Sequence, residues 1–161
     1  MSRGGRVVNV VIAGLGGQGV LTASDILAGA AFRAGLDVKK AEVHGMSQRG
    51  GSVTSDVRFG PEVLSPMVPA GEADFLLVLE PSEVAGNRPA LAPGGLLVPP
   101  DAVAVGALPN RRSLNVALLG VLAARLDLPE GCWLDALREA LPARLLEVNE
   151  KAFRIGRETA R

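Results

Sequence analysis

The stretch VVNVVIAGLGGQGVLTASDILAGAAFRAGLDV, residues 7–38, decides the fold of this chain. Its first part, Val7 to Ala13, is a run of mostly β-branched apolar residues bounded by Gly14, which predicts a buried strand. Beyond the glycines, apolar residues recur at helical spacing from Val20 to Ala34, and Gly35 stands where a helix would stop. The stretch therefore predicts a strand, a glycine turn and a helix.

The glycine turn has the spacing G-x-G-x-x-G with one additional glycine. Its members are Gly14, Gly16, Gly17 and Gly19. Such a turn lets backbone N–H groups approach an anion, and the helix that follows begins with free donors and a positive dipole end. A dinucleotide site also needs an acidic residue about 20 residues further on. Glu42 stands near that distance, but Lys39 and Lys40 precede it. The turn alone leaves open a nicotinamide or flavin site, a packing role and contact with another protein.

The rest of the chain continues as an α/β domain. Residues 52–59 alternate apolar and polar side chains, which is typical of a half-buried and often antiparallel strand. Further strands are expected at 37–43, 73–81 and within PGGLLVPPD (93–101). Helices are expected from Ser113, a candidate N-cap, and at 133–141 and 142–155.

These patterns predict one domain over residues 1–161. We expect a three-layer α/β/α Rossmann-like fold with a mostly parallel, mixed sheet, a core at about 7–110 and C-terminal helices at about 113–157.

Charge and cysteine content exclude several classes of function. The chain has 17 Lys and Arg against 17 Asp and Glu and no long basic run, so we expect no nucleic-acid partner. Its single cysteine, Cys132, is expected to pack, and one cysteine cannot hold a disulfide or an iron-sulfur cluster alone. The N-terminus MSRGGR lacks the layout of a signal peptide, and no apolar run reaches the ~20 residues that span a bilayer. We expect a cytoplasmic protein without a metal site of its own.

The stretch EVHGMSQRGGSV, residues 42–53, is more polar and more flexible than a strand connection requires. Its candidate catalytic residues are His44 and Arg49; a lone histidine also commonly has a structural role, whereas the planar guanidinium suits a carboxylate or phosphate. This stretch and the glycine turn should share one rim of the sheet. The candidate residues for binding an anion, a cofactor or a partner are Gly14, Gly16, Gly17, Gln18, Gly19, Gln48, Arg49, Gly50 and Gly51.

Taken together, four stretches resemble the gamma-type subunits of 2-oxoacid:ferredoxin oxidoreductases, and most of all the beta subunits of the indolepyruvate enzymes. The stretches are GLGGQGVLTASDILAGAAFRAG, EVHGMSQRGGSVTSDVRFG, SPMVPAGEADFLLVLEPSE and LAPGGLLV. The resemblance runs from about Val8 to LLEVNEKAFRIG near the C-terminus. VHGMSQRGG in place of the GPEARGG pattern of the pyruvate enzymes indicates indolepyruvate or another aryl pyruvate as the substrate.

The resemblance implies a complex that oxidatively decarboxylates a 2-oxoacid to an acyl-coenzyme A and passes electrons to ferredoxin. It places thiamine diphosphate, Mg²⁺ and the iron-sulfur clusters on a larger partner subunit, with coenzyme A as co-substrate of the complex. This chain lacks the GDG motif with a downstream Asn that holds thiamine diphosphate, so we expect it to be inactive alone. An independent NAD(P)- or FAD-binding oxidoreductase is the alternative.

A subunit of this kind should leave an apolar interface uncovered and self-associate when isolated. The candidate segment is GPEVLSPMVPAGEA, residues 60–73, where Val63, Leu64, Met67 and Val68 are more apolar than a solvated loop requires.

Overall fold

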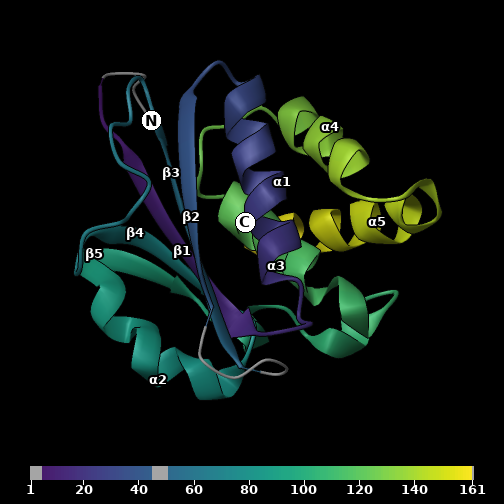
Figure 1. The fold of residues 1–161 in the computed structure, drawn as a ribbon. Coiled ribbons are helices and arrows are strands. Elements are labelled where there is room, and N and C mark those ends of the chain that lie inside the picture. The colour runs from purple at the N-terminus through teal and green to yellow at the C-terminus, as the bar shows by residue number, and fades with distance from the viewer. Residues whose placement is uncertain (1–4, 45–50, 161) are drawn as a thin grey trace.

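The computed structural model describes residues 5–44 and 51–160, with the side chain of His44 left out (Figure 1). Within these residues, five strands form one sheet in the order β2-β3-β1-β4-β5. The strands are β1 (Val8–Leu15), β2 (Asp37–His44), β3 (Ser52–Gly60), β4 (Ala73–Val78) and β5 (Leu91–Val98).

Strand direction decides where the ends of the strands meet. β3 runs antiparallel to both of its neighbours, β1 and β2, whereas β4 is parallel to β1 and β5 is parallel to β4. The strands β1, β2, β4 and β5 therefore run the same way, which confirms the expected mostly parallel, mixed sheet. Their carboxyl ends lie on one edge, which we call the glycine rim because the glycine turn follows β1 there.

Helices cover both faces of the sheet unequally (Figure 1). They are α1 (Val20–Arg33), α2 (Val84–Asn87), α3 (Leu114–Ala123), α4 (Glu130–Ala140) and α5 (Ala143–Thr159). α1 and α3 lie on one face, α4 packs against α1, and α5 packs against α3. The short α2 lies across the sheet from them (Figure 1). None of the helices among the described residues combines the length and the apolar character that crossing a membrane requires.

Single turns of 3-10 helix complete the connections. They are η1 (Pro81–Glu83), η2 (Arg88–Ala90), η3 (Pro100–Ala102), η4 (Val105–Ala107) and η5 (Arg111–Ser113).

The main core lies between the sheet and the large helices. Fully buried side chains from α1, α3, α4 and α5 fill it, including Ile26, Leu118, Trp133 and Phe153. The rings of Trp133 and Phe153 pack with centroids 5.5 Å apart. A smaller apolar cluster on the opposite face holds Val11, Leu76 and Val78, which β1 and β4 supply. Both faces of β1 and β4 are therefore buried, as continuous apolar runs predict.

Two glycines bring α3 and α5 into backbone contact. A Cβ on Gly156 would lie 2.7 Å from the carbonyl carbon of Ala117, and one on Gly120 would lie 2.8 Å from Arg157 N. These distances leave no room for a methyl group, so the helices can pack this closely only with glycine at both positions.

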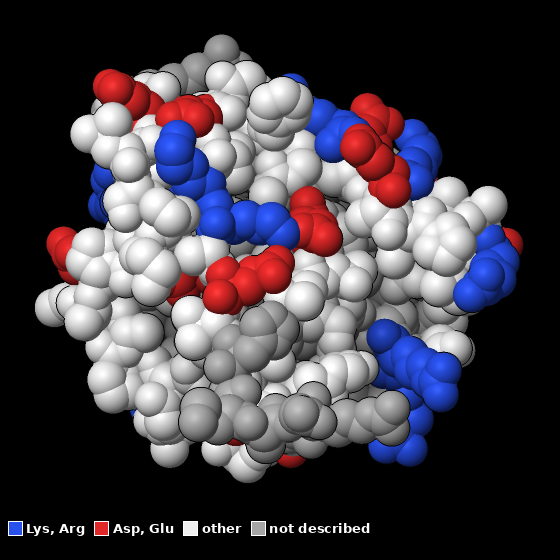
Figure 2. Space-filling model, viewed as in Figure 1, with Lys and Arg blue, Asp and Glu red and all other residues white. Residues whose placement is uncertain are grey.

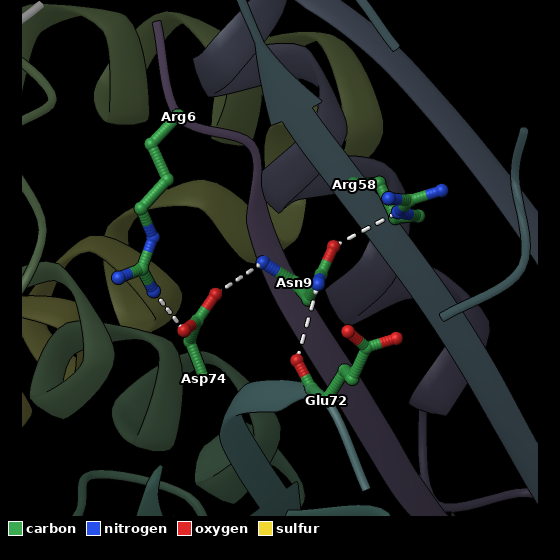
Figure 3. Close-up of polar contacts among 5 residues, drawn as sticks. All are labelled: Arg6, Asn9, Arg58, Glu72 and Asp74. Carbon is green, nitrogen blue, oxygen red and sulfur yellow. Dashed lines mark hydrogen bonds and ion pairs between the residues drawn. The ribbon is translucent and has the colours of Figure 1, made fainter. Parts of the chain in front are cut away.

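The amino end of β1 is fixed by a polar network at the side of the sheet opposite the glycine rim (Figure 3). Asn9 accepts from Arg58 Nε through Oδ1 at 2.8 Å and donates from Nδ2 to the Glu72 carbonyl at 3.1 Å. Its backbone N–H donates to Asp74 Oδ2 at 2.8 Å, and Arg6 pairs with the same carboxylate. The network ties β1 to β3 and to the start of β4.

The segment 61–72 is anchored by carboxylates of the sheet. Val63 N–H donates to Asp37 Oδ2 at 2.7 Å, and this bond lowers the pKa of the Asp37 carboxyl. Val68 N–H donates to Asp56 Oδ2 at 2.9 Å, but burial is the larger effect there and raises the pKa of Asp56. Both carboxylates fix a segment that has no helix or strand of its own.

Three expectations about the helices need correction. α4 begins at Glu130, before the expected residue 133, and α5 extends beyond 155 to Thr159. Ser113 does stand at the N-cap position of α3, but its hydroxyl makes no cap bond and donates to the Asn110 carbonyl instead. The capping bond nearby is made by Asn110, whose side chain accepts from Arg112 N.

Candidate functional site

The glycine turn has the backbone geometry that the motif predicts. Gly17 and Gly19 have φ of +90° and +86°, a region that strongly favours glycine. Gly14 serves packing, because a Cβ there would lie 3.0 Å from Val20 Cγ2 and 3.1 Å from Leu79 Cβ. The glycines therefore allow both the sharp turn and the close approach of α1 to the strands.

Gln18 is bonded at both ends of its amide. Its Oε1 accepts from Leu15 N–H at 2.8 Å, and its Nε2 donates to Glu80 Oε2 at 2.8 Å. Glu80 follows β4, so the bond joins the connection after β1 to the connection after β4. This candidate binding residue is engaged within the chain.

The amino end of α1 opens onto the rim. Gly19 occupies the N-cap in the left-handed conformation, no side chain caps the helix, and its first turn contains no acidic residue. Helix N-termini with free N–H groups and an unopposed dipole favour anions.

A second wall of this site comes from the C-terminal third of the chain. η5 and the start of α3 bring Arg111, Arg112 and Asn115 to the glycine turn, where they line a pocket of about 440 Å³ together with Gly17, Gln18 and Gly19. Asn115 Nδ2 donates to the Gly19 carbonyl at 3.2 Å. Asn115 Oδ1 is buried and has no hydrogen-bond partner among the described residues. The pocket is therefore lined by two arginines and lies next to Gly19, the N-cap of α1.

This wall of the site was not predicted from the sequence. The only local signal was the pair Arg111 and Arg112 directly before a helix, and nothing in that pair indicates contact with a turn some ninety residues earlier.

On the face shown in Figure 2, acidic and basic side chains intermingle over the upper half, while basic ones gather at the lower right.

An apolar hollow adjoins the pocket. It measures about 780 Å³, is lined mainly by Pro and Val side chains after β4 and β5, and shares Leu79, Arg111 and Leu114 with the first pocket. An anionic ligand with an apolar portion could therefore lie across both.

Gly51, which directly precedes β3, lies at the same rim as the glycine turn. Gly16 N–H donates to the Gly51 carbonyl at 2.9 Å, and Ser52 Oγ donates to Glu83 Oε1 at 2.8 Å. β1 and β2 are not neighbours, because β3 pairs between them, and His44 stands opposite Val53 in that ladder. The candidates Gln48, Arg49 and Gly50 lie outside the described residues, as does the His44 side chain.

Glu42, the acidic residue that a dinucleotide site would need, has another partner. Glu42 Oε1 accepts from Lys40 Nζ at 3.1 Å, and Lys40 also pairs with Asp25 on α1. Burial of Lys40 acts to lower its pKa, but the bonds to Asp25 and Glu42 outweigh it and raise the pKa. Glu42 is thus tied to a charged lysine, which disfavours its use on a ribose hydroxyl.

Metal ligands do not gather in the part of the chain that the structure describes. No three His, Cys, Asp or Glu side chains there lie close enough to hold a metal ion. The half-buried Cys132 is a free thiol. The described residues therefore do not fit an iron-sulfur cluster.

The expected apolar segment is only partly exposed. The side chains of Leu64 and Met67 are 85% and 50% exposed, but Val63 is buried and Val68 is half-buried. The prediction that Val63 is exposed was wrong. Its backbone N–H is bonded to Asp37, which holds this residue against the sheet.

Comparisons with known proteins agree with one another. The family model described as pyruvate ferredoxin/flavodoxin oxidoreductase matches residues 9–109. The indolepyruvate oxidoreductase subunit IorB of Thermococcus kodakarensis is 35% identical, over 95% of this chain and 96% of its own.

Two solved structures share the fold. The gamma subunit of a keto/oxoacid ferredoxin oxidoreductase from Geobacter sulfurreducens has a TM-score of 0.80 at 23% identity and covers 95% of this chain and 98% of that chain. A 2-oxoglutarate:ferredoxin oxidoreductase from Magnetococcus marinus, with 2-oxoglutarate, coenzyme A and succinyl-CoA bound, has a TM-score of 0.80 at 22% identity. It covers 97% of this chain, which corresponds to 31% of that chain.

Proposed function

The chain belongs to the pyruvate ferredoxin/flavodoxin oxidoreductase family, and we propose that it is the small subunit of a thiamine-diphosphate-dependent 2-oxoacid:ferredoxin oxidoreductase. In this proposal, thiamine diphosphate, Mg²⁺ and the iron-sulfur clusters belong to a larger partner subunit. The complex decarboxylates a 2-oxoacid oxidatively, forms an acyl-coenzyme A and passes electrons to ferredoxin. The small subunit is inactive alone.

The glycine rim carries this proposal. It gathers donors for an anion, from Arg111, Arg112 and the first turn of α1, beside an apolar hollow. The described residues hold no metal-ligand cluster that would make the rim a redox centre of its own. A rim of this composition suits the phosphates of coenzyme A and the edge of a partner's active site. The Magnetococcus marinus enzyme, which shares this fold, has coenzyme A bound.

Indolepyruvate or another aryl pyruvate is the substrate that we propose for the complex. The stretch VHGMSQRGG and the name of the Thermococcus kodakarensis relative both support it.

The alternative, an independent NAD(P)- or FAD-binding oxidoreductase, is disfavoured by the Lys40–Glu42 bond. Titration calorimetry of the purified chain with NAD, FAD and coenzyme A separates the two: tight binding of NAD or FAD with no response to coenzyme A would favour the alternative.

The direct experiment is affinity capture of the chain from its own cells, followed by metal and thiamine analysis of what is retained. We expect a larger subunit that carries thiamine diphosphate and iron. We also expect the purified small subunit to be colourless, because one cysteine cannot hold a cluster. Visible cluster absorbance, or turnover of a 2-oxoacid by the chain alone, would contradict the proposal.

A further inference from the structure

The amide of Gln18 occupies a slot that the turn leaves over Gly14. An ideal Cβ on Gly14 would lie 2.9 Å from Gln18 Oε1, so the amide fits there only because residue 14 is glycine. From that slot Oε1 accepts from Leu15 N–H, and Nε2 reaches Glu80. The side chain folds back over its own turn and also ties that turn to β4.

Glu80 sets which way this amide faces. A carboxylate can only accept hydrogen bonds, so the NH₂ group must point to Glu80 and the carbonyl must point to Leu15 N–H. Without Glu80, only the bond from Leu15 N–H would favour this orientation of the amide. The position of the glycine turn therefore depends on a charged residue that is distant in sequence and follows another strand.

We propose that Gln18 and Glu80 form a positioning pair, which holds the glycine turn so that the first N–H groups of α1 face the anionic portion of the ligand. The inference rests on the proposed function, in which coenzyme A phosphates occupy the glycine rim. Gln18 also lines the pocket beside Arg111 and Arg112, so a small displacement of the turn alters the pocket directly. Neither residue exchanges a proton with substrate.

Exchanging the side chains of residues 18 and 80 tests whether the direction of the hydrogen bond between them matters, or only the presence of two polar groups. Gln18→Glu alone places two carboxylates against each other and removes the donor, which should lower kcat/KM for coenzyme A in the complex by about tenfold. Glu80→Gln alone offers both a donor and an acceptor to the Gln18 amide, so it no longer imposes one orientation and should raise KM for coenzyme A by a smaller factor than Gln18→Glu does. The double variant, Gln18→Glu with Glu80→Gln, restores one acceptor for Leu15 N–H and one donor opposite it, and should recover most of the loss.

A pH profile adds a readout that a structural defect alone would not give. In Gln18→Glu, a proton shared between the two carboxyl groups restores a donor, so the defect should shrink as the pH falls toward 6 relative to the wild-type complex. The wild-type and double-variant profiles should coincide.

The matched control lies at the other end of β1. Asn9 also uses both ends of its amide, to Arg58 and Glu72 (Figure 3), so Asn9→Asp makes the same chemical change far from the rim. It should alter the stability of the chain and leave KM for coenzyme A unchanged.

The outcomes distinguish the two proposals. A wild-type complex that is inactive, together with a wild-type chain that shows no calorimetric response to coenzyme A, would overturn the proposed function and this inference with it. An active wild-type complex in which Gln18→Glu has normal kcat/KM, or in which the double variant is no better than Gln18→Glu, would overturn the positioning pair alone.

Discussion

Replacement of Gly19 by alanine tests the geometry of the glycine rim most sharply. Gly19 has φ of +86°, where an L-residue with a Cβ costs about 1–2 kcal/mol. The added methyl would also overlap Asn115 Nδ2 and lie 3.1 Å from Asn115 Cγ. Asn115 is buried and donates to the Gly19 carbonyl, so displacing it loses that bond, at a further ~1–3 kcal/mol. We expect Gly19→Ala to lose about 2–5 kcal/mol of unfolding free energy.

Gly17→Ala is the matched control. Gly17 has nearly the same φ, +90°, but nothing lies within 4 Å of the position of its Cβ. Gly17→Ala should lose only the unfolding free energy that the positive φ costs, about 1–2 kcal/mol. The effect of alanine on the unfolded chain is the same in both variants and cancels in their difference. Urea unfolding of both variants gives the difference, which measures the Asn115 contact. Equal losses in the two variants would refute the contact between α3 and the glycine turn.

Three further predictions concern other parts of the chain. Gly156→Ala should destabilise the protein by about 1–3 kcal/mol in urea unfolding, because its methyl would overlap the Ala117 carbonyl; a stability equal to wild type would mean that α3 and α5 are not in backbone contact. Asp37→Asn should make the free energy of unfolding depend less on pH under acid conditions. The bond from Val63 lowers the pKa of Asp37, so the Asp37 carboxylate contributes stability above its ordinary pKa near 4 and loses that contribution as the pH falls through the lowered pKa. Unfolding curves between pH 6 and 3 check this, and parallel wild-type and variant profiles would contradict it. Arg49→Ala should leave the fold intact and lower activity of the reconstituted complex about tenfold or more, with partial rescue by Arg49→Lys; unchanged activity with normal assembly would reduce the stretch to a turn.

The first unit of the fold was predictable because its determinants are local. The apolar run of β1, the spacing of the glycines and the apolar stripe of α1 follow one another in the sequence, and the period of two in β3 gave its half-buried, antiparallel character. The start of α4 was missed because Gly131 interrupts the apolar pattern, although Glu130 in the first turn is itself a start signal.

The candidate site was predictable only on one side. The glycine turn and Gly51 lie at the same rim, because β1 and β2 run in the same direction. Its other wall depends on the packing of Asn115 against Gly19, a contact between residues 96 positions apart. No local periodicity encodes such a contact, and the same holds for the Gln18–Glu80 bond.

The most direct test of the proposed role is reconstitution of the complex from separately purified subunits. Reduction of ferredoxin is followed with an aryl pyruvate and coenzyme A, using the larger subunit alone, the small subunit alone and both together. We expect coenzyme A-dependent reduction of ferredoxin only when both subunits are present. Equal rates with the larger subunit alone, or turnover by the small subunit alone, would contradict it.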